Sequence, residues 1–91
     1  AEIANAQAEL EAAEARLAAL EGSGIEQARE GVRLAELSYR AGKSTLVELI
    51  DAQQAYAATQ AELIAARQAR AEARAILSRQ AAADGDADHQ P

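Results

Sequence analysis

Residues 39–53 read YRAGKSTLVELIDAQ, and this segment separates two alanine-rich helical patterns. Gly42 follows a periodic helical run, so we expect it to end the first helix in the left-handed conformation that glycine adopts without steric cost. Thr45 and Glu48 then have the spacing of a capping box, in which hydroxyl and carboxylate each accept a backbone N–H of the other residue. A helix end and a helix start so close together predict two antiparallel helices joined at a tip.

The composition limits the chain to one small helical domain. It has 91 residues without Phe, Trp, Met or Cys, and alanine is its most frequent residue. Alanine favours helices and lets them approach closely, but it buries little apolar area, so thin, extended helical packing is predicted. The net charge of −6 argues against a nucleic-acid partner, because phosphate binding needs clustered Lys and Arg. No apolar stretch is long enough to span a bilayer, so membrane contact is expected only through segments missing from this chain.

Apolar periodicity divides the chain into four segments. Residues 1–21 carry a seven-residue repeat and predict an N-terminal helix, whereas Gly-Ser-Gly at 22–24 predicts a flexible linker. Residues 25–80 predict a helical hairpin with its tip at 42–45, and the aspartate-rich residues 81–91 predict a disordered tail. The expected fold is all-α: an antiparallel coiled-coil hairpin with an additional N-terminal helix that folds back on it.

The helix expected from Thr45 to about Gln80 carries two apolar seams. One repeats large residues with a seven-residue period, at Leu49, Tyr56, Leu63 and Leu77. The other has mostly small residues, at Ala52, Ala55, Thr59, Ala66, Ala69, Ala73 and Ile76. We expect one seam on each side of the helix, as in the wall of a helical barrel, where each helix contacts two neighbours. A plain antiparallel coiled coil of two or three helices, with one wide apolar stripe, is the alternative that periodicity alone leaves open.

No pattern of residues indicates an enzyme or a bound cofactor. The serines lack a neighbouring histidine base, and the Gly-Ser-Gly segment is too short for a phosphate-binding loop. His89 is the single histidine and lies in the expected tail beside Asp86 and Asp88, where no fixed geometry would hold a metal ion. We therefore expect no catalytic residue, no metal site and no cofactor.

The tip sequence is similar to that of a known family. Tyr39-x-x-Gly42, followed by Leu46-x-Glu48-Leu49-Ile50-Asp51-Ala52-Gln53, resembles the carboxy-terminal repeat of the TolC-like outer membrane efflux proteins, and most closely their heavy-metal subgroup. The similarity covers residues 25–80. It implies a trimeric conduit with an outer-membrane β-barrel and a long periplasmic α-barrel, whose hairpin tips meet a periplasmic adaptor protein bound to an inner-membrane pump. The chain would then be an α-barrel tip fragment, the periplasmic part of a Gram-negative outer membrane protein.

The resemblance also implies which residues form the site. The adaptor-docking turn corresponds here to Gly42, Lys43, Ser44, Thr45 and Leu46. Acidic residues that line the conduit entrance correspond to Glu48 and Asp51, and a tyrosine that helps to hold the entrance closed corresponds to Tyr39. Some members have a basic residue two positions after the glycine, where this chain has Ser44. From the residues alone, Glu48 could simply cap its helix, Asp51 could be a solvated acid, and Tyr39 could pack in the seam.

The chain also departs from the family pattern. The β-strands and the first repeat are missing, and residues 22–24 stand where the family has several tens of residues. We therefore expect an excised or stitched part of a longer protein, or a chain in which only part was retained. Two other functions stay open: a purely structural coiled-coil scaffold, and the hairpin of a periplasmic adaptor itself. The run from Leu49 to Gln53 favours the channel over the adaptor.

Overall fold

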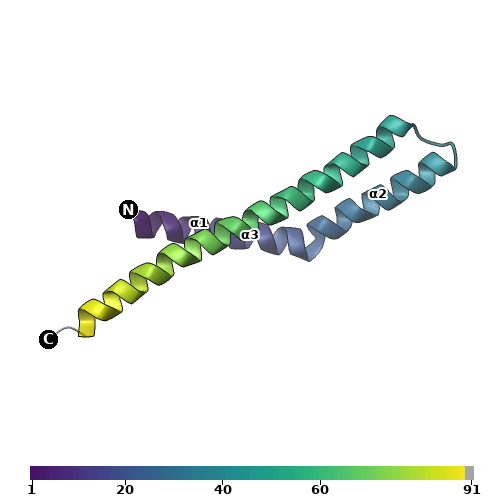
Figure 1. Cartoon of the computed structure of the whole chain (residues 1–91). Helices are drawn as coiled ribbons and strands as arrows, with labels where there is room; N and C mark the ends of the chain where they lie inside the picture. The colour runs from purple at the N-terminus through teal and green to yellow at the C-terminus, as the bar shows by residue number, and fades with distance from the viewer. Residues whose placement is uncertain (90–91) are drawn as a thin grey trace.

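The chain folds into one long, thin helical hairpin (Figure 1). The computed structural model describes the backbone of residues 1–89 and the side chains of residues 1–84. Helix α1 (Glu2–Ala19) continues through a π-helical turn, η1 (Leu20–Gly24), into α2 (Ile25–Arg40), and α3 (Leu46–His89) returns along them. The described part measures 77 × 18 × 14 Å, and α3 alone spans about 66 Å at 1.5 Å per residue. The expected all-α antiparallel hairpin is confirmed.

The hairpin has two helical arms rather than three: α1, η1 and α2 form one arm, and α3 forms the other. Both α1 and α2 pack on α3, and within the described residues they do not pack on each other. The expectation that residues 1–21 fold back on the hairpin is therefore wrong. Residues 22–24 are not a flexible linker either, because η1 keeps its residues helical and joins α1 to α2 without a break.

A single-residue insertion explains η1. On α1 the apolar seam advances in steps of three and four, at Ile3, Ala6, Leu10, Ala13, Leu17 and Leu20, and on α2 it continues as Ile25, Ala28, Val32, Ala35 and Tyr39. All of these residues except Ile3 and Tyr39, at its two ends, are buried or half-buried. The step from Leu20 to Ile25 is five, one residue too many for a continuous heptad. A π turn accommodates one extra residue per turn, so both halves face the same partner. Gly24 suits this turn, because a Cβ there would lie 3.3 Å from the carbonyl oxygen of Ala19.

The two seams expected on α3 form one seam in the structure. The residues at positions Leu49, Ala52, Tyr56, Thr59, Leu63, Ala66, Ala73 and Leu77 are all buried or half-buried. With half-buried Arg70 between Ala66 and Ala73, this seam advances in steps of three and four, so the large set and most of the small set face the helix formed by residues 1–40. The expected arrangement with one seam on each side of α3 is therefore corrected.

Small residues make the α1–α3 half the tightest part of the hairpin. Ala6, Ala13, Ala66 and Ala73 are buried, as are Leu17 and Leu20. Alanine allows close approach of the helices. Two ion pairs follow one edge of this half, from Arg67 Nη2 to Glu21 Oε2 at 3.2 Å and from Arg74 Nη2 to Glu14 Oε1 at 3.4 Å. All four side chains are about half exposed, so each pair contributes at most about 1 kcal/mol.

The carboxyl end of α3 is longer than expected. The helix continues through Ala81, Ala82 and Ala83 to His89, whereas the sequence predicted a disordered tail over 81–91. Three consecutive alanines have the highest helix propensity and carry the helix past Gln80. Residues 90–91, and the side chains of Asp86, Asp88 and His89, lie outside the described part.

Candidate functional site

The tip begins where α2 ends in a Schellman motif. Gly42 has a φ of +73°, the left-handed conformation expected from the sequence. The N–H of Lys43 donates to the carbonyl oxygen of Ser38 at 2.9 Å, and the N–H of Gly42 donates to that of Tyr39 at 3.0 Å. These two bonds satisfy carbonyl groups that the helix end would otherwise leave without partners.

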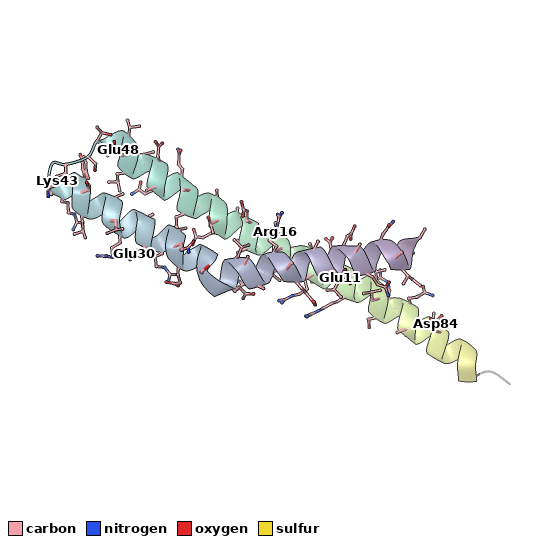
Figure 2. The ribbon with its side chains drawn as sticks, turned by 180° about the vertical axis from the view of Figure 1, so that it is seen from behind. Glu11, Arg16, Glu30, Lys43, Glu48 and Asp84 are labelled. Atoms are coloured by element: carbon pink, nitrogen blue, oxygen red, sulfur yellow. The ribbon has the colours of Figure 1, made fainter. Side chains whose placement is uncertain are left out.

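The tip ends in the predicted capping box. The N–H of Glu48 donates to Thr45 Oγ1 at 3.2 Å, and the N–H of Thr45 donates to Glu48 Oε2 at 3.4 Å. The first backbone bond of α3 then runs from the N–H of Leu49 to the carbonyl oxygen of Thr45 at 3.3 Å. Because both helix ends are closed by local hydrogen bonds, residues 41–45 form a compact turn at the end of the rod, where Figure 2 shows Lys43 and Glu48.

Four of the five residues expected at the docking tip are exposed. Gly42, Lys43 and Thr45 are solvent-accessible, and Leu46 is 51% exposed although it is a large apolar residue. Ser44 is half-buried, and its Oγ is buried without a hydrogen-bond partner. Ser44 therefore points inward in this turn, while its neighbours present backbone and side chains at the end of the rod.

The three residues expected at the entrance lie on both helices. Tyr39 is on the last turn of α2 and is 42% exposed, so it is only partly packed in the seam. Glu48 and Asp51 are exposed on the first turns of α3, three residues apart and hence on one face. Glu48 also accepts the Thr45 N–H, so its carboxylate caps α3 in this structure.

Large exposed apolar residues gather on both sides of the tip. Leu34 and Leu37 on α2 are 53% and 52% exposed, and Val47 and Ile50 on α3 are 65% and 40% exposed. Among the residues expected at the site from the sequence, Tyr39 and Leu46 belong to this group. The signal was present, since Leu34, Leu37 and Ala41 form a second stripe on α2 beside the seam. Exposed apolar residues concentrated in one region mark a surface that contacts another molecule.

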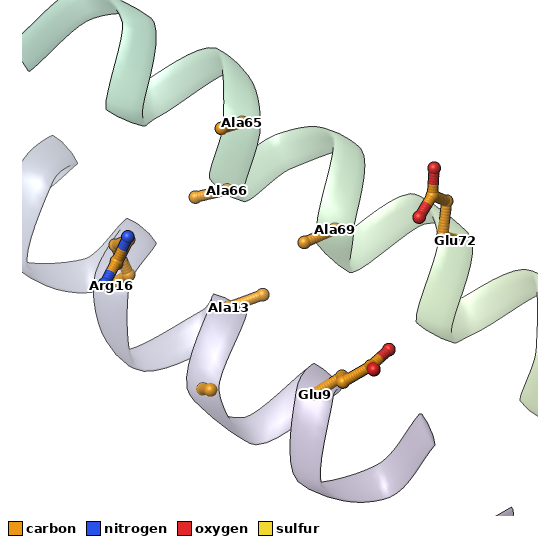
Figure 3. A pocket seen from close by; sticks show the side chains of 8 residues that line it. Glu9, Ala13, Arg16, Ala65, Ala66, Ala69 and Glu72 are labelled. Atoms are coloured by element: carbon orange, nitrogen blue, oxygen red, sulfur yellow. The ribbon is translucent and has the colours of Figure 1, made fainter. Parts of the chain in front are cut away.

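A shallow groove lies between α1 and α3, far from the tip (Figure 3). Its floor is alanine, including Ala13, Ala66 and Ala69, and Glu9 of α1 and Glu72 of α3 lie at one end of it. Arg16 of α1 lies toward the other end of the groove. A shallow groove with an alanine floor and two carboxylates is suited to packing against another surface rather than to catalysis. Among residues 1–84, no three acidic or histidine side chains come together in a way that could hold a metal ion.

The sequence that forms this rod-like hairpin matches the model of one protein family. A family model described as outer membrane efflux protein matches residues 1–83. The chain belongs to the outer membrane efflux protein family. Searches of curated proteins and of solved structures each found no match.

The family match confirms the expected membership of the outer membrane efflux proteins, without resolving a subgroup. The matched region includes α1 and η1 and so extends beyond the residues 25–80 that carried the resemblance. The outer membrane efflux proteins are channel proteins rather than enzymes, so this chain is not an enzyme. No helix in the described part of this family member has an apolar stretch of the length needed to cross a bilayer.

Proposed function

We propose that this chain is the periplasmic hairpin of a trimeric outer membrane efflux channel of Gram-negative bacteria. In this proposal the tip docks a periplasmic adaptor protein end to end, and the residues beside it narrow the conduit entrance. One observation carries the proposal: a compact, doubly capped turn stands at the end of a long rod and is flanked by exposed leucine, isoleucine and valine side chains.

Lateral self-association is supported by the faces that the hairpin leaves uncovered. On α3 the outward stripe carries no charge over eight turns, at Val47, Ile50, Gln54, Ala57, Ala61, Ile64, Gln68, Ala71 and Ala75. On residues 1–41 the outward stripe has Glu30 as its single charged residue, among Asn5, Ala8, Ala12, Ala15, Ala19, Gly22, Gln27, Leu34, Leu37 and Ala41. All of these residues are exposed. Each helix thus has an inner seam for its own hairpin and an outer stripe suited to a neighbouring hairpin, which is the requirement for a closed helical wall.

Docking is supported by the shape and chemistry of the tip. At Gly42 no heavy atom lies within 4 Å of the position a Cβ would take, so a partner helix end can approach the backbone there. Leu46 and Val47 supply apolar area on the α3 side, and Lys43 supplies a charge that favours an acidic partner surface. The end of the rod therefore combines an open backbone turn with apolar flanks, as an end-to-end contact requires.

The entrance role rests on two acids and one tyrosine. Glu48 and Asp51 share a face of α3, so a threefold axis beside that face would gather six carboxylates around the conduit. A ring of carboxylates favours the passage of cations over anions. Tyr39, partly exposed at the end of α2, can contact a neighbouring hairpin and hold the entrance narrow.

Two apolar-to-glutamate substitutions test adaptor docking and self-association separately. Leu46→Glu places a charge at the tip, whereas Ile64→Glu places the same charge on the outer stripe, at a residue of similar exposure, 56% against 51%. We expect Leu46→Glu to abolish co-purification with the adaptor while the trimer persists, and Ile64→Glu to weaken the trimer. Loss of the trimer in both variants, or adaptor binding by Leu46→Glu, would reject the tip as the docking site.

A second pair of substitutions tests the entrance. Neutralising both carboxylates with the double substitution Glu48→Gln and Asp51→Asn should reduce the cation selectivity of the channel in planar bilayer recordings. The matched control is Glu62→Gln with Glu72→Gln, which removes the same charge from α3 farther from the tip. Equal selectivity in both double variants would show that the acids near the tip have no special role in conduction.

A further inference from the structure

The π turn gives α2 two alternative seams. In the structure the extra residue in η1 puts Ile25, Ala28, Val32, Ala35 and Tyr39 toward α3. If η1 became ordinary α-helix, the phase set by Leu17 and Leu20 would instead run through Gly24, Gln27, Gly31, Leu34, Ser38 and Ala41. This second set is uncharged throughout and includes Leu34, which is 53% exposed in the structure.

Helices α1 and α2 differ in how firmly they are packed against α3. Helix α1 buries Ala6, Ala13 and Leu17, and two ion pairs link α1 and η1 to α3. Helix α2 has no fully buried residue. Its ion pairs, Glu26–Arg29 and Glu30–Arg33, are internal and would move with the helix. Rotation of α2 would therefore leave the α1–α3 half and all four of these ion pairs in place.

We propose that η1 is a register switch that allows α2 to rotate against α3 while α1 stays fixed. Conversion of the π turn to ordinary α-helix, with the chain length unchanged, shifts the seam of α2 by one residue, which is a rotation of about 100° at 3.6 residues per turn. This rotation would carry Leu34 into the seam and Val32 out of it. The observed register is the ground state, because it packs Ile25 and Val32 where the other register offers Gly24 and Gly31.

A consequence for the tip follows from its covalent connection to α2. The Schellman motif anchors Gly42 and Lys43 to the carbonyl groups of Tyr39 and Ser38, so the turn moves with α2. One register keeps Leu34 and Leu37 on the outer face, and the other withdraws Leu34 from it. The switch would therefore change which apolar side chains the rod presents near its end. It is a property of this chain alone and does not depend on adaptor docking.

Deletion of one residue from η1 provides the test. Without Ser23 the step from Leu20 to Ile25 becomes four, so an uninterrupted α-helix holds the observed seam and the second register is lost. The matched control is Gly22→Ala with Ser23→Ala, which keeps the length and hence the extra residue. The chain has no cysteine, so Val32→Cys and, separately, Ala13→Cys report on each half through their rates of thiol labelling.

Locking the register should protect α2 and leave α1 unaffected. In the deletion variant we expect labelling of Val32→Cys to slow at least fivefold and exchange of α2 amides to slow at least tenfold, with Ala13→Cys unchanged. The length-preserving control should label like the parent. Equal labelling of Val32→Cys in the deletion variant and the parent would overturn the proposal. Deletion of Gly22 should act like deletion of Ser23, and failure of both variants to fold, judged by helical circular dichroism, would overturn it as well.

Discussion

Substituting Gly42 by alanine tests the tip geometry at a single torsion angle. At φ +73° an alanine Cβ strains the backbone, and no heavy atom lies within 4 Å of that Cβ to add a clash. The cost is therefore the left-handed conformation alone, roughly 1–2 kcal/mol for a residue other than glycine. Gly42→Asn should cost less, because asparagine tolerates this conformation better than alanine does.

Gly31 supplies the matched control within the same chain. It lies inside α2, is exposed, and also has no heavy atom within 4 Å of the position a Cβ would take, so Gly31→Ala adds only helix propensity. That change should stabilise the hairpin by about 0.5–1 kcal/mol. Both substitutions restrict the unfolded chain equally, so the difference between their changes in the free energy of unfolding reports on the backbone conformation of the folded state alone.

Urea unfolding followed by circular dichroism at 222 nm measures both free energies. We expect Gly42→Ala to lower the free energy of unfolding and Gly31→Ala to raise it, with melting temperatures moving in opposite directions by about 4–8 °C per kcal/mol. The same sign for both alanine variants would refute the left-handed turn at Gly42. An asparagine variant as unstable as the alanine variant would refute the strain as its cause.

Three further changes follow from the structure. Thr45→Ala removes the capping hydroxyl and should lower the free energy of unfolding by about 1 kcal/mol in the same urea assay, and no loss would contradict the capping box. Ala73→Leu forces a large side chain into a fully buried position and should destabilise the hairpin by roughly 1–3 kcal/mol, whereas exposed Ala71→Leu should have little effect on melting temperature. The hydrogen bond from Arg33 holds the pKa of the Glu30 carboxyl below its ordinary value, so its contribution is present at neutral pH and is lost as pH falls through that lowered pKa. Glu30→Gln should make melting temperature less dependent on pH in this acid range, and an unchanged dependence would contradict the pair.

The tip was predictable because its determinants are local. A glycine after a periodic run and a threonine three residues before a glutamate each specify backbone hydrogen bonds within five residues. The structure shows both sets, at Gly42 and at Thr45. The antiparallel hairpin followed from these two signals together. Tertiary context was not needed at any of these steps.

The region around Gly22 cannot be predicted from its composition, because the phase of the flanking seam decides its structure. Gly-Ser-Gly resembles a linker in composition, but the steps of three and four on either side require one continuous seam with an insertion of one residue. The step of five between Leu20 and Ile25 was the available signal, and it predicts a π turn rather than a break. Packing against α3 then keeps the glycines helical, which short-range propensity cannot indicate.

The extent of the candidate site could be only partly predicted, for a related reason. The resemblance identified the turn and the acids, whereas the exposed flank depends on which stripe of α2 faces α3. The sequence shows Leu34 and Leu37 on a second stripe, but the insertion in η1 decides which stripe faces α3 and so places these two residues on the outer face. In a hairpin of two helical arms, whether a residue is exposed depends on the phase of the apolar seam along the whole arm.

Site-specific photo-crosslinking along α3 tests the central claim most directly. A photoreactive side chain at Leu46 examines the end of the rod, and one at Ile64 examines the outer stripe, both at exposed residues. In intact cells we predict that Leu46 captures a different protein, the periplasmic adaptor, whereas Ile64 captures a second copy of this chain. Capture of the same partner at both positions, or of no partner at Leu46, would contradict a docking tip on a wall of laterally packed hairpins.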